Sequence, residues 1–471
     1  MARVFSGAST VLDDRLALGL APALTPQGLQ TSPSFFHGFA AHPQVIARAL
    51  VVLSEITATR YFQFVTTDLR DPVLSAHGDR LRAEVFSACN SVYASLEVFG
   101  TGLDGGDIGF GTTNVDINAQ TRTMLNNISQ NELMHLNVGT SGLTVSTVEV
   151  SALERPVQMP ARWVRALGNA SDMHQDLRPV FQVQAPAARA FLASLPPASA
   201  QKRAGWLIPE KNTIRVAPAK PPKATGVWVA GLQRLSALKR LLPHVMGLSA
   251  FGTADPLDAG GTGAVAIALD LPHARVTLGL TDVEWRGFSG EGALLESLAT
   301  PDVVDNADLL SALLAFDAHI DTGRLARESG LTNPQVTQAL AVLASSGRVG
   351  WEINEGQYFH RELPQDNTLV TKDNPRLVSA RKLVEDGQVR RVEGATNEWI
   401  VASGSKSAGS KEYTVRVGTN STNSANNANN ETPLEQAQCT CTWYLKHGTG
   451  RGPCKHVLAV VLTLGESRWR D

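Results

Sequence analysis

Two segments on either side of residue 90 alternate between apolar and polar residues. These segments, residues 80–86 and 93–99, have the period of half-buried strands, in which every second side chain faces a core. Residues 133–138 and 143–150 alternate around a glycine-containing turn, which predicts a hairpin. Further short strands are predicted at residues 114–117, 264–271 and 274–280.

Apolar residues spaced three and four apart predict helices elsewhere in the first 300 residues. The helical ranges are 43–57, 119–128, 161–167, 187–195 and 232–242. They do not alternate one for one with the strands, so an α+β fold is predicted and not a doubly wound parallel sheet. Residues 196–225 are rich in Pro, Ala and Lys. We expect them to separate an N-terminal α+β domain (1–195) from a second α+β segment (196–300).

The order of elements changes to helix, helix, turn, helix and hairpin in residues 301–364. Helices are predicted at 307–316, 322–328 and 332–346, the last with a threonine at its N-cap and one apolar face. Two alternating segments around a glycine follow at residues 348–360. This order is similar to that of a winged helix, so a winged-helix-like domain is expected here.

The C-terminal residues 372–471 are predicted to form a separate small domain. A helix is expected over residues 375–385. Strands are expected at 388–392, 398–402 and 412–417. Residues 418–430 are almost entirely Asn, Ser and Thr, and we expect a disordered loop that contributes nothing to a core.

Composition is ordinary for packed domains, with 43% hydrophobic and 18% charged residues among 471. The net charge of −2 gives no overall attraction to nucleic acid or to an anionic membrane surface. The N-terminal residues lack the apolar core of a signal peptide, and no apolar run reaches the ~18 residues of a membrane span. We therefore expect a cytoplasmic protein with no membrane contact.

Three of the four cysteines lie close together near the C-terminus. Cys439 and Cys441 are separated by one residue, and twelve residues later Cys454 is followed by a lysine and His456. Three thiolates and one imidazole form the ligand set of a closed tetrahedral zinc site. Such a site leaves no position for water, so it stabilises a fold and does not activate a nucleophile. The motif predicts a Zn²⁺-binding structural module.

The sequence leaves two alternatives to this ligand set open. His447 is a second imidazole near the motif and competes for the fourth position. Alternatively, the clustered cysteines are unpaired thiols that lie together by chance. Cys89, the remaining cysteine, lies between two predicted strands and is expected to pack as a small apolar residue.

The four ligand residues, the strands before them and Trp443 after the C-x-C together resemble the SWIM zinc-finger family. The resemblance extends from near Lys372 to the C-terminus. It implies that the first two cysteines lie on a hairpin, and that Cys454 and His456 lie at the start of a helix. Backbone N–H groups at that helix start would stabilise the thiolates. The Asn-rich stretch before the C-x-C departs from the family pattern and lengthens the module.

The longer chain, with residues 111–116 and 285–290, also resembles bacterial SWIM proteins that carry the finger at the C-terminus. Those proteins are associated with MoxR-type AAA ATPases and von Willebrand A-domain proteins. The wider resemblance implies a protein partner in a multi-protein system and not a free-standing enzyme.

Charge counts decide how well either small domain would bind nucleic acid. Residues 301–364 contain four basic and nine acidic residues, and the expected recognition helix at 332–346 has no Lys or Arg. Because neutralisation of phosphates supplies most of the affinity for DNA, this segment is expected to contact protein or to be purely structural.

The finger segment differs, because residues 372–471 contain 14 basic and 10 acidic residues. Basic and aromatic side chains together suit weak contact with phosphate or single strands, and they equally suit a protein contact. The candidate contact residues are Arg390, Arg391, Trp443, Lys446, Arg451 and Lys455.

No local motif of a common enzyme class occurs in the chain. A phosphate-binding G-x-x-x-x-G-K-[ST], a zinc-protease H-E-x-x-H and a G-x-S-x-G are all missing. Since catalytic residues need not be adjacent in sequence, an enzyme within residues 1–300 stays open as a third possibility. The sequence favours a non-enzymatic adaptor that docks partner proteins, with a nucleic-acid-binding regulator as the alternative.

Overall fold

The computed structural model describes most of the chain. The described residues are 10–12, 15–17, 23–25, 28–30, 34–67, 72–105, 107–157, 159–253, 263–285, 287–288, 303–314, 317–361, 375–395, 397–403, 411–417, 437–447 and 453–467. Arg451 and the Asn-rich residues 418–430 lie outside them. The chain divides into two compact units: residues 1–289, 315–320 and 347–365 form the first, and residues 290–314, 321–346 and 366–471 form the second.

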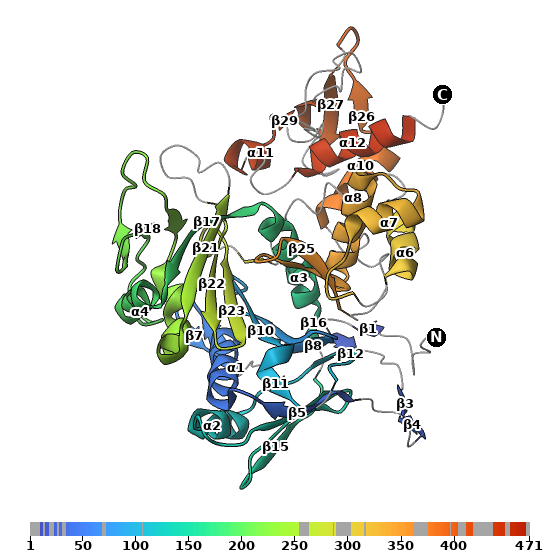
Figure 1. The fold of residues 1–471 in the computed structure, drawn as a ribbon. Helices are drawn as coiled ribbons and strands as arrows, with labels where there is room; N and C mark the ends of the chain where they lie inside the picture. The colour runs from blue at the N-terminus through green and yellow to red at the C-terminus, as the bar shows by residue number, and fades with distance from the viewer. Residues whose placement is uncertain are drawn as a thin grey trace. The chain divides into compact units, whose positions relative to one another are not determined.

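The first unit is built around an eight-stranded antiparallel sheet, shown in Figure 1 from blue to yellow-green. Its strand order is β12 (Phe110–Asn114), β8 (Val73–His77), β9 (Arg80–Phe86), β10 (Val92–Phe99), β23 (Ala274–Leu280), β22 (Val265–Leu271), β21 (Gly247–Thr253) and β17 (Leu177–Gln184). Strands from both sides of position 196 share this sheet. The first two expected segments therefore contribute to one structure, and the four-domain division stays a prediction.

Helix α1 (Pro43–Ala58) covers one face of this sheet and supplies much of its core. Its buried residues occur on nearly all sides, as expected for a helix enclosed by other elements. Leu81, Ala83 and Val85 of β9 belong to the same hydrophobic cluster as Ile46 and Leu50 of α1. The alternation of β9 thus places its apolar side chains toward α1.

A second sheet of the first unit has the order β11 (Leu103–Asp104), β5 (Ser34–Ala40), β13 (His135–Gly139), β14 (Gly142–Ser146) and β15 (Ser151–Glu154). The predicted hairpin at 133–150 is confirmed as β13 and β14. Gly142 begins the return strand with φ +109°, where a Cβ would lie 2.0 Å from the carbonyl oxygen of Glu154. Only glycine is compatible with this turn.

Two strands of a three-stranded sheet lie in the segment that was expected to separate two domains. Its order is β19 (Ile214–Ala217), β18 (Gly205–Pro209) and β20 (Val227–Val229). Trp206, Ile208 and Ala217 form a small apolar cluster there, so the segment is folded, and its expected place between two domains stays a prediction. The high proline and lysine content marks the turns between these strands.

The remaining elements of the first unit are shorter or pack around the sheets. They are β1 (Thr10–Leu12), β2 (Arg15–Ala17), β3 (Ala23–Thr25), β4 (Gly28–Gln30), β6 (Thr59–Arg60), β7 (Val65–Thr66), η1 (Gly100–Gly102), α2 (Ala119–Asn127), β16 (Met159–Pro160), α3 (Ala161–Gln175), α4 (Ala185–Ser194) and the 3-10 helix η2 (Leu232–His244).

Hairpin β24 (Val349–Glu352) and β25 (Gln357–His360) also belongs to the first unit. It packs against α3 and covers the polar side of β9. Arg82 of β9 lies 3.1 Å from the carboxylate of Glu352, and Glu84 lies 2.7 Å from Arg361 just after the hairpin. The hairpin therefore explains why charged residues of β9 are buried.

Three helices of the second unit, α6 (Val303–Leu313), α7 (Thr322–Ser329) and α8 (Asn333–Ser345), pack on one another. The side chain of Asp321 caps α7, and Thr332 and Gln335 form a capping box at the start of α8. The expected hairpin groups with the first compact unit and not with these helices. The winged-helix assignment stays a prediction.

The C-terminal part of the second unit contains a four-stranded antiparallel sheet and three helices, drawn in orange and red in Figure 1. The elements are α10 (Pro375–Glu385), β26 (Val389–Arg391), β27 (Glu398–Ser403), β28 (Lys411–Arg416), β29 (Gln438–Cys439), α11 (Thr442–His447) and α12 (Lys455–Ser467). Helix α12 packs on α10 and on strands of the sheet. The predicted α+β class is confirmed. Among the described residues, no helix has the length and apolar composition needed to cross a bilayer.

Candidate metal centre

The four candidate ligands converge from one strand end and one helix start. Cys439 ends β29, which pairs with β28 through Val415, and Cys441 follows immediately before α11. Cys454 and His456 flank the first residue of α12. All four side chains are buried, with 2–4% of each residue exposed. Cys454 and His456 lie at a helix start, as the resemblance implied, whereas of the first two cysteines only Cys439 lies in a strand and Cys441 lies in the bend before α11.

The bend between the first two cysteines is held by contacts with β28. The N–H of Thr440 donates to the carbonyl of Thr414 at 3.1 Å, and the Thr440 hydroxyl accepts from the Thr414 N–H at 3.0 Å. These two hydrogen bonds fix the backbone at Thr440, so Cys439 and Cys441 on either side of it direct their sulfurs toward the metal centre. The sequence reading did not identify this threonine contact.

Ligand atoms of Cys439, Cys441, Cys454 and His456 all lie within 4.8 Å of one another. Nδ1 of His456 is 3.8 Å from the sulfur of Cys439 and 4.0 Å from that of Cys454. In a tetrahedral zinc site, bond lengths of about 2.3 Å to sulfur and 2.0–2.1 Å to nitrogen separate neighbouring ligands by about 3.6–3.8 Å. The donor set and its spacing therefore fit Zn²⁺.

His456 presents Nδ1 to the sulfurs, and its ring stacks on Tyr413 of β28 with centroids 4.4 Å apart. Its other ring nitrogen, Nε2, is buried without a hydrogen-bond partner among the described residues. The stacked tyrosine fixes the orientation of the imidazole ring. In many metal sites a hydrogen-bond partner of the second ring nitrogen has this role. Tyr413 was missed by sequence reasoning, although its strand had been predicted.

Backbone N–H groups also contact the sulfurs. The N–H of Tyr444 lies 3.3 Å from Cys441 Sγ, and the N–H of Cys441 lies 3.5 Å from Cys439 Sγ. Hydrogen bonds donated by the Cys439 and Cys454 thiols lower the pKa of Cys441. The hydrogen bond that the Cys439 thiol donates to Cys441 raises the pKa of Cys439. A metal would bind all three sulfurs as thiolates, the form in which sulfur binds a metal.

Arg376 of α10 connects the two ligand-bearing segments. Its Nη1 donates to the carbonyl of Pro453 at 2.7 Å, and its guanidinium lies 4.5 Å from the ring centroid of Trp443. One arginine thus contacts the residue before Cys454 and the helix after Cys441. No local sequence signal identifies it, because Arg376 lies more than sixty residues before the motif.

The candidate contact residues that are described lie on different elements, with Trp443 on α11. Arg390 and Arg391 lie on β26, where Arg390 pairs with Glu412 at 3.0 Å and Arg391 lies over Trp399. Lys455 begins α12 and is half-buried. The side chains of Lys446 and His447, and the whole of Arg451, lie outside the described residues. A contact role for these residues stays a prediction.

Residues 413–465 match the family model described as SWIM zinc finger. This range contains all four ligand residues, so the motif, the geometry and the family match agree. No curated protein matches the chain.

Solved structures similar to this chain include two proteins of one kind. A crystal structure of Proliferating Cellular Nuclear Antigen from Entamoeba histolytica covers 53% of this chain and 99% of its own, at 10% identity and TM-score 0.34. A PCNA2-PCNA3 complex from Sulfolobus tokodaii covers 52% of this chain and 98% of its own, at 6% identity and TM-score 0.36. At these TM-scores the similarity supports no inference about fold or function.

Proposed function

We propose that this chain, which carries a SWIM zinc finger at residues 413–465, is a non-enzymatic adaptor that docks partner proteins. The observation that carries the proposal is the closed, buried ligand set of three sulfurs and one imidazole. Zn²⁺ held there by all four residues would cross-link β29 to α12 and would have no position for a substrate or water. A metal that only stabilises the fold supports a role for the protein as a binding module and not as a metalloenzyme.

The surface beside the centre supports contact with a protein. Leu445 of α11 is 76% exposed, although it lies only four residues after the ligand Cys441. Anchoring of α11 by Cys441 and by the hydrogen bond from Tyr444 Oη to the carbonyl of Ala437 would present this leucine in a defined position. An apolar side chain that is held in a fixed position can act as an anchor that fills a pocket on a partner protein.

The charge arrangement favours a protein over nucleic acid. Arg390 pairs with Glu412 at 3.0 Å, and Arg416 pairs with Glu398 at 3.3 Å on the same sheet. Carboxylates beside these arginines reduce the positive potential that phosphate binding requires. The nucleic-acid-binding regulator therefore remains the second candidate, supported by the excess of basic residues in 372–471.

The proposed partner is a protein of a multi-protein system in the cytoplasm, of the AAA ATPase and von Willebrand A-domain kind that the wider resemblance implies. A reducing compartment suits the proposal, because the three clustered thiols must stay reduced to bind a metal. No catalytic role is proposed for either unit.

The test is recovery of partner proteins from the native cell with zinc-loaded protein and single variants. Leu445→Glu should retain zinc and lose the partner, whereas the control Leu309→Glu, an exposed leucine on α6, should retain both. Cys454→Ser should lose zinc and partner together. Recovery that is unchanged in both Leu445→Glu and Cys454→Ser contradicts the adaptor proposal.

The second candidate has its own readout. If the finger binds nucleic acid, affinity for oligonucleotides should fall steeply between low and moderate salt, and Arg390→Ala with Arg391→Ala should abolish binding. Binding of that kind, together with no partner recovery, would replace the adaptor by the regulator.

A further inference from the structure

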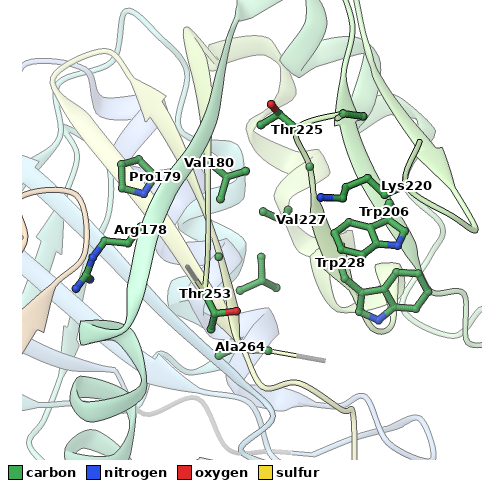
Figure 2. Close-up of a pocket in the computed structure, with 15 residues that line it drawn as sticks. Arg178, Pro179, Val180, Trp206, Lys220, Thr225, Val227, Trp228, Thr253 and Ala264 are labelled. Atoms are coloured by element: carbon green, nitrogen blue, oxygen red, sulfur yellow. The ribbon is translucent and has the colours of Figure 1, made fainter. Parts of the chain in front are cut away.

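A pocket of about 370 Å³ lies in the first unit, between strands β17, β21 and β22 on one side and strands β18 and β20 on the other. Figure 2 shows its labelled residues on two facing walls. This volume lies within the range of about 300–1,000 Å³ that is usual for small-molecule sites. The pocket is part of neither the metal centre nor the buried charges around β9.

Two tryptophans form one wall. Trp206 of β18 and Trp228 of β20 are direct cross-strand partners, and their rings meet edge to face with centroids 5.8 Å apart. Trp206 is 8% exposed and belongs to the apolar cluster of its small sheet, whereas Trp228 is half-buried. Trp228 therefore retains ring surface on which a flat ligand can stack.

Lys220 adds a positive charge to the tryptophan wall. Its ammonium nitrogen lies 5.2 Å from the ring centroid of Trp206, and Figure 2 shows that nitrogen directed toward the pocket interior. Arg178 also borders the pocket, but Figure 2 shows its guanidinium turned away, and its Nη1 donates to the carbonyl of Leu177 at 3.1 Å. Among the described lining residues, Lys220 is thus the cation available to a ligand.

No carboxylate occurs among the described residues that line the pocket. An aromatic pair alone would also suit a cationic ligand through cation–π contacts. Here the ammonium of Lys220 would repel such a cation, and no described lining residue would neutralise it. The charge therefore selects an anion, while Trp228 selects a flat ring.

The opposite wall supplies polar groups and an irregular strand. The pairing of β17 with β21 shifts register between Pro179 and Phe181, which leaves Val180 as a bulge that lines the pocket. Thr225 and Thr253, which carry hydroxyl groups, also line it. Bulges frequently lie beside binding sites, where they redirect a strand, and hydroxyls can donate to an anion or to ring atoms.

We propose that this pocket binds a small anion that carries a flat aromatic ring, as in a nucleoside monophosphate or the terminal nucleotide of a single strand. Trp228 stacks on the ring, and Lys220 pairs with the phosphate. The proposal is independent of the adaptor role, because the pocket lies in the other compact unit.

The experiment is calorimetric titration of the full-length, zinc-loaded protein with adenosine monophosphate, adenosine, inorganic phosphate and a short single-stranded oligonucleotide. Adenosine monophosphate should bind at least about tenfold more tightly than adenosine or phosphate alone, because stacking and charge pairing act together. Phosphate that binds as tightly as the nucleotide overturns the proposal, since the ring then contributes nothing.

Variants distinguish a binding site from simple packing of Lys220 on Trp206. Trp228→Leu should weaken nucleotide binding about tenfold or more, and Trp228→Phe should retain most of it. Lys220→Met keeps the apolar stem but removes the charge, so it should weaken binding of the nucleotide and leave that of adenosine unchanged. The matched control Lys211→Met, an exposed lysine in the turn after β18, should bind as wild type.

Two further outcomes are informative. Strong binding of the oligonucleotide with weak binding of the mononucleotide, lost in Trp228→Leu and Lys220→Met, identifies the ligand as a strand terminus. Cys454→Ser should retain the binding, which separates this site from the finger. The proposal is wrong if no titrant binds, or if affinity is the same in Trp228→Leu and Lys220→Met as in wild type.

Discussion

Hairpin β24–β25 buries several charged side chains of the first unit. The stability of this region depends on individual ion pairs among them. Glu84 of β9 accepts from Arg361 at 2.7 Å and from the Tyr93 hydroxyl at 2.8 Å. The side chains of Glu84 and Arg361 are each 1% exposed. Because neither charge reaches water, each depends on the other, and removal of one leaves the other uncompensated.

Arg361→Met should therefore lower the free energy of unfolding by about 3–5 kcal/mol. Methionine keeps an apolar side chain near Phe359, so the decrease in the free energy of unfolding comes mainly from the unpaired charge of Glu84. Urea unfolding measures the effect. Arg215→Met, which breaks an exposed pair with Glu210, should cost less than about 1 kcal/mol. Equal losses in the two variants would show that Arg361 is not buried as described.

Glu352 on the same hairpin should make stability depend on pH. Burial, with repulsion from Glu97 added, raises its pKa from 4.5 to about 7. The folded protein then binds this proton more tightly than the unfolded chain does. The resulting stability is present below pH 4.5 and is lost as the pH rises toward 7.

Glu352→Gln fixes this side chain in a neutral form. The wild type loses this stability as the pH rises and the variant does not. The melting temperature of the variant minus that of the wild type should therefore increase from pH 5 to pH 8. Buried His77, whose pKa is lowered by burial and by nearby Arg82, contributes the opposite trend, but it is common to both proteins and cancels in the difference. Glu210→Gln, at an exposed carboxylate, should show no such change, and a flat difference for Glu352→Gln contradicts the prediction.

At the scale of elements, the ends of the helices in residues 303–346 show how local chemistry sets boundaries. Helix α7 begins after the Asp321 cap and ends at Gly330, which has φ +72° and donates its N–H to the carbonyl of Ala326 at 3.1 Å. No atom lies within 4 Å of the position that a Cβ would occupy at Gly330. The glycine is therefore required by backbone conformation and not by space.

Gly330→Ala should lower the free energy of unfolding by about 1–2 kcal/mol, the cost of a left-handed conformation for a residue with a Cβ. Gly330→Asn should cost less, because asparagine adopts this conformation more readily. Thermal unfolding of both variants provides the comparison. Equal costs for Ala and Asn would mean that the left-handed backbone is not the cause.

Secondary structure with clear periodicity was predictable from the sequence. Strand β9 occupies the predicted residues 80–86, and helix α10 occupies 375–385. The segment at 196–225 was not predictable in the same way, since its strands are short and its prolines lie at a strand end or in the connections between strands. Strand β18 pairs with β20, which lies outside this segment, and also with β19. A local sequence pattern does not identify such a partner.

At the scale of the whole molecule, the metal centre should control the C-terminal part of the second unit alone. Zinc-coupled folding of small modules is worth roughly 10–16 kcal/mol, which exceeds the stability of many small domains. The eight-stranded sheet of the first unit has its own extensive apolar core and contains no metal ligand. Loss of metal should therefore unfold one region and spare the other.

Cys454→Ser, or a strong chelator, should remove one zinc ion per chain. Amide hydrogen exchange should then accelerate in β27, β28 and α12 and stay slow in β9, β10 and β22. Metal analysis and exchange mass spectrometry measure the two effects. Cys89→Ser, which changes the cysteine outside the motif, should retain zinc, and unfolding of the entire chain by chelation would contradict this division.

The sequence by itself predicted the zinc ligands, because Cys439, Cys441, Cys454 and His456 lie within eighteen residues at a spacing typical of such sites, with His447 left as an alternative fourth ligand. It also determined the α+β class through hydrophobic periodicity. Only the tertiary structure decided that β24–β25 buries the charges of β9, that Arg376 contacts both sides of the centre, and that Trp228 and Lys220 border one pocket. These features join residues far apart in the chain, so they depend on which elements become neighbours, and local patterns do not specify that choice.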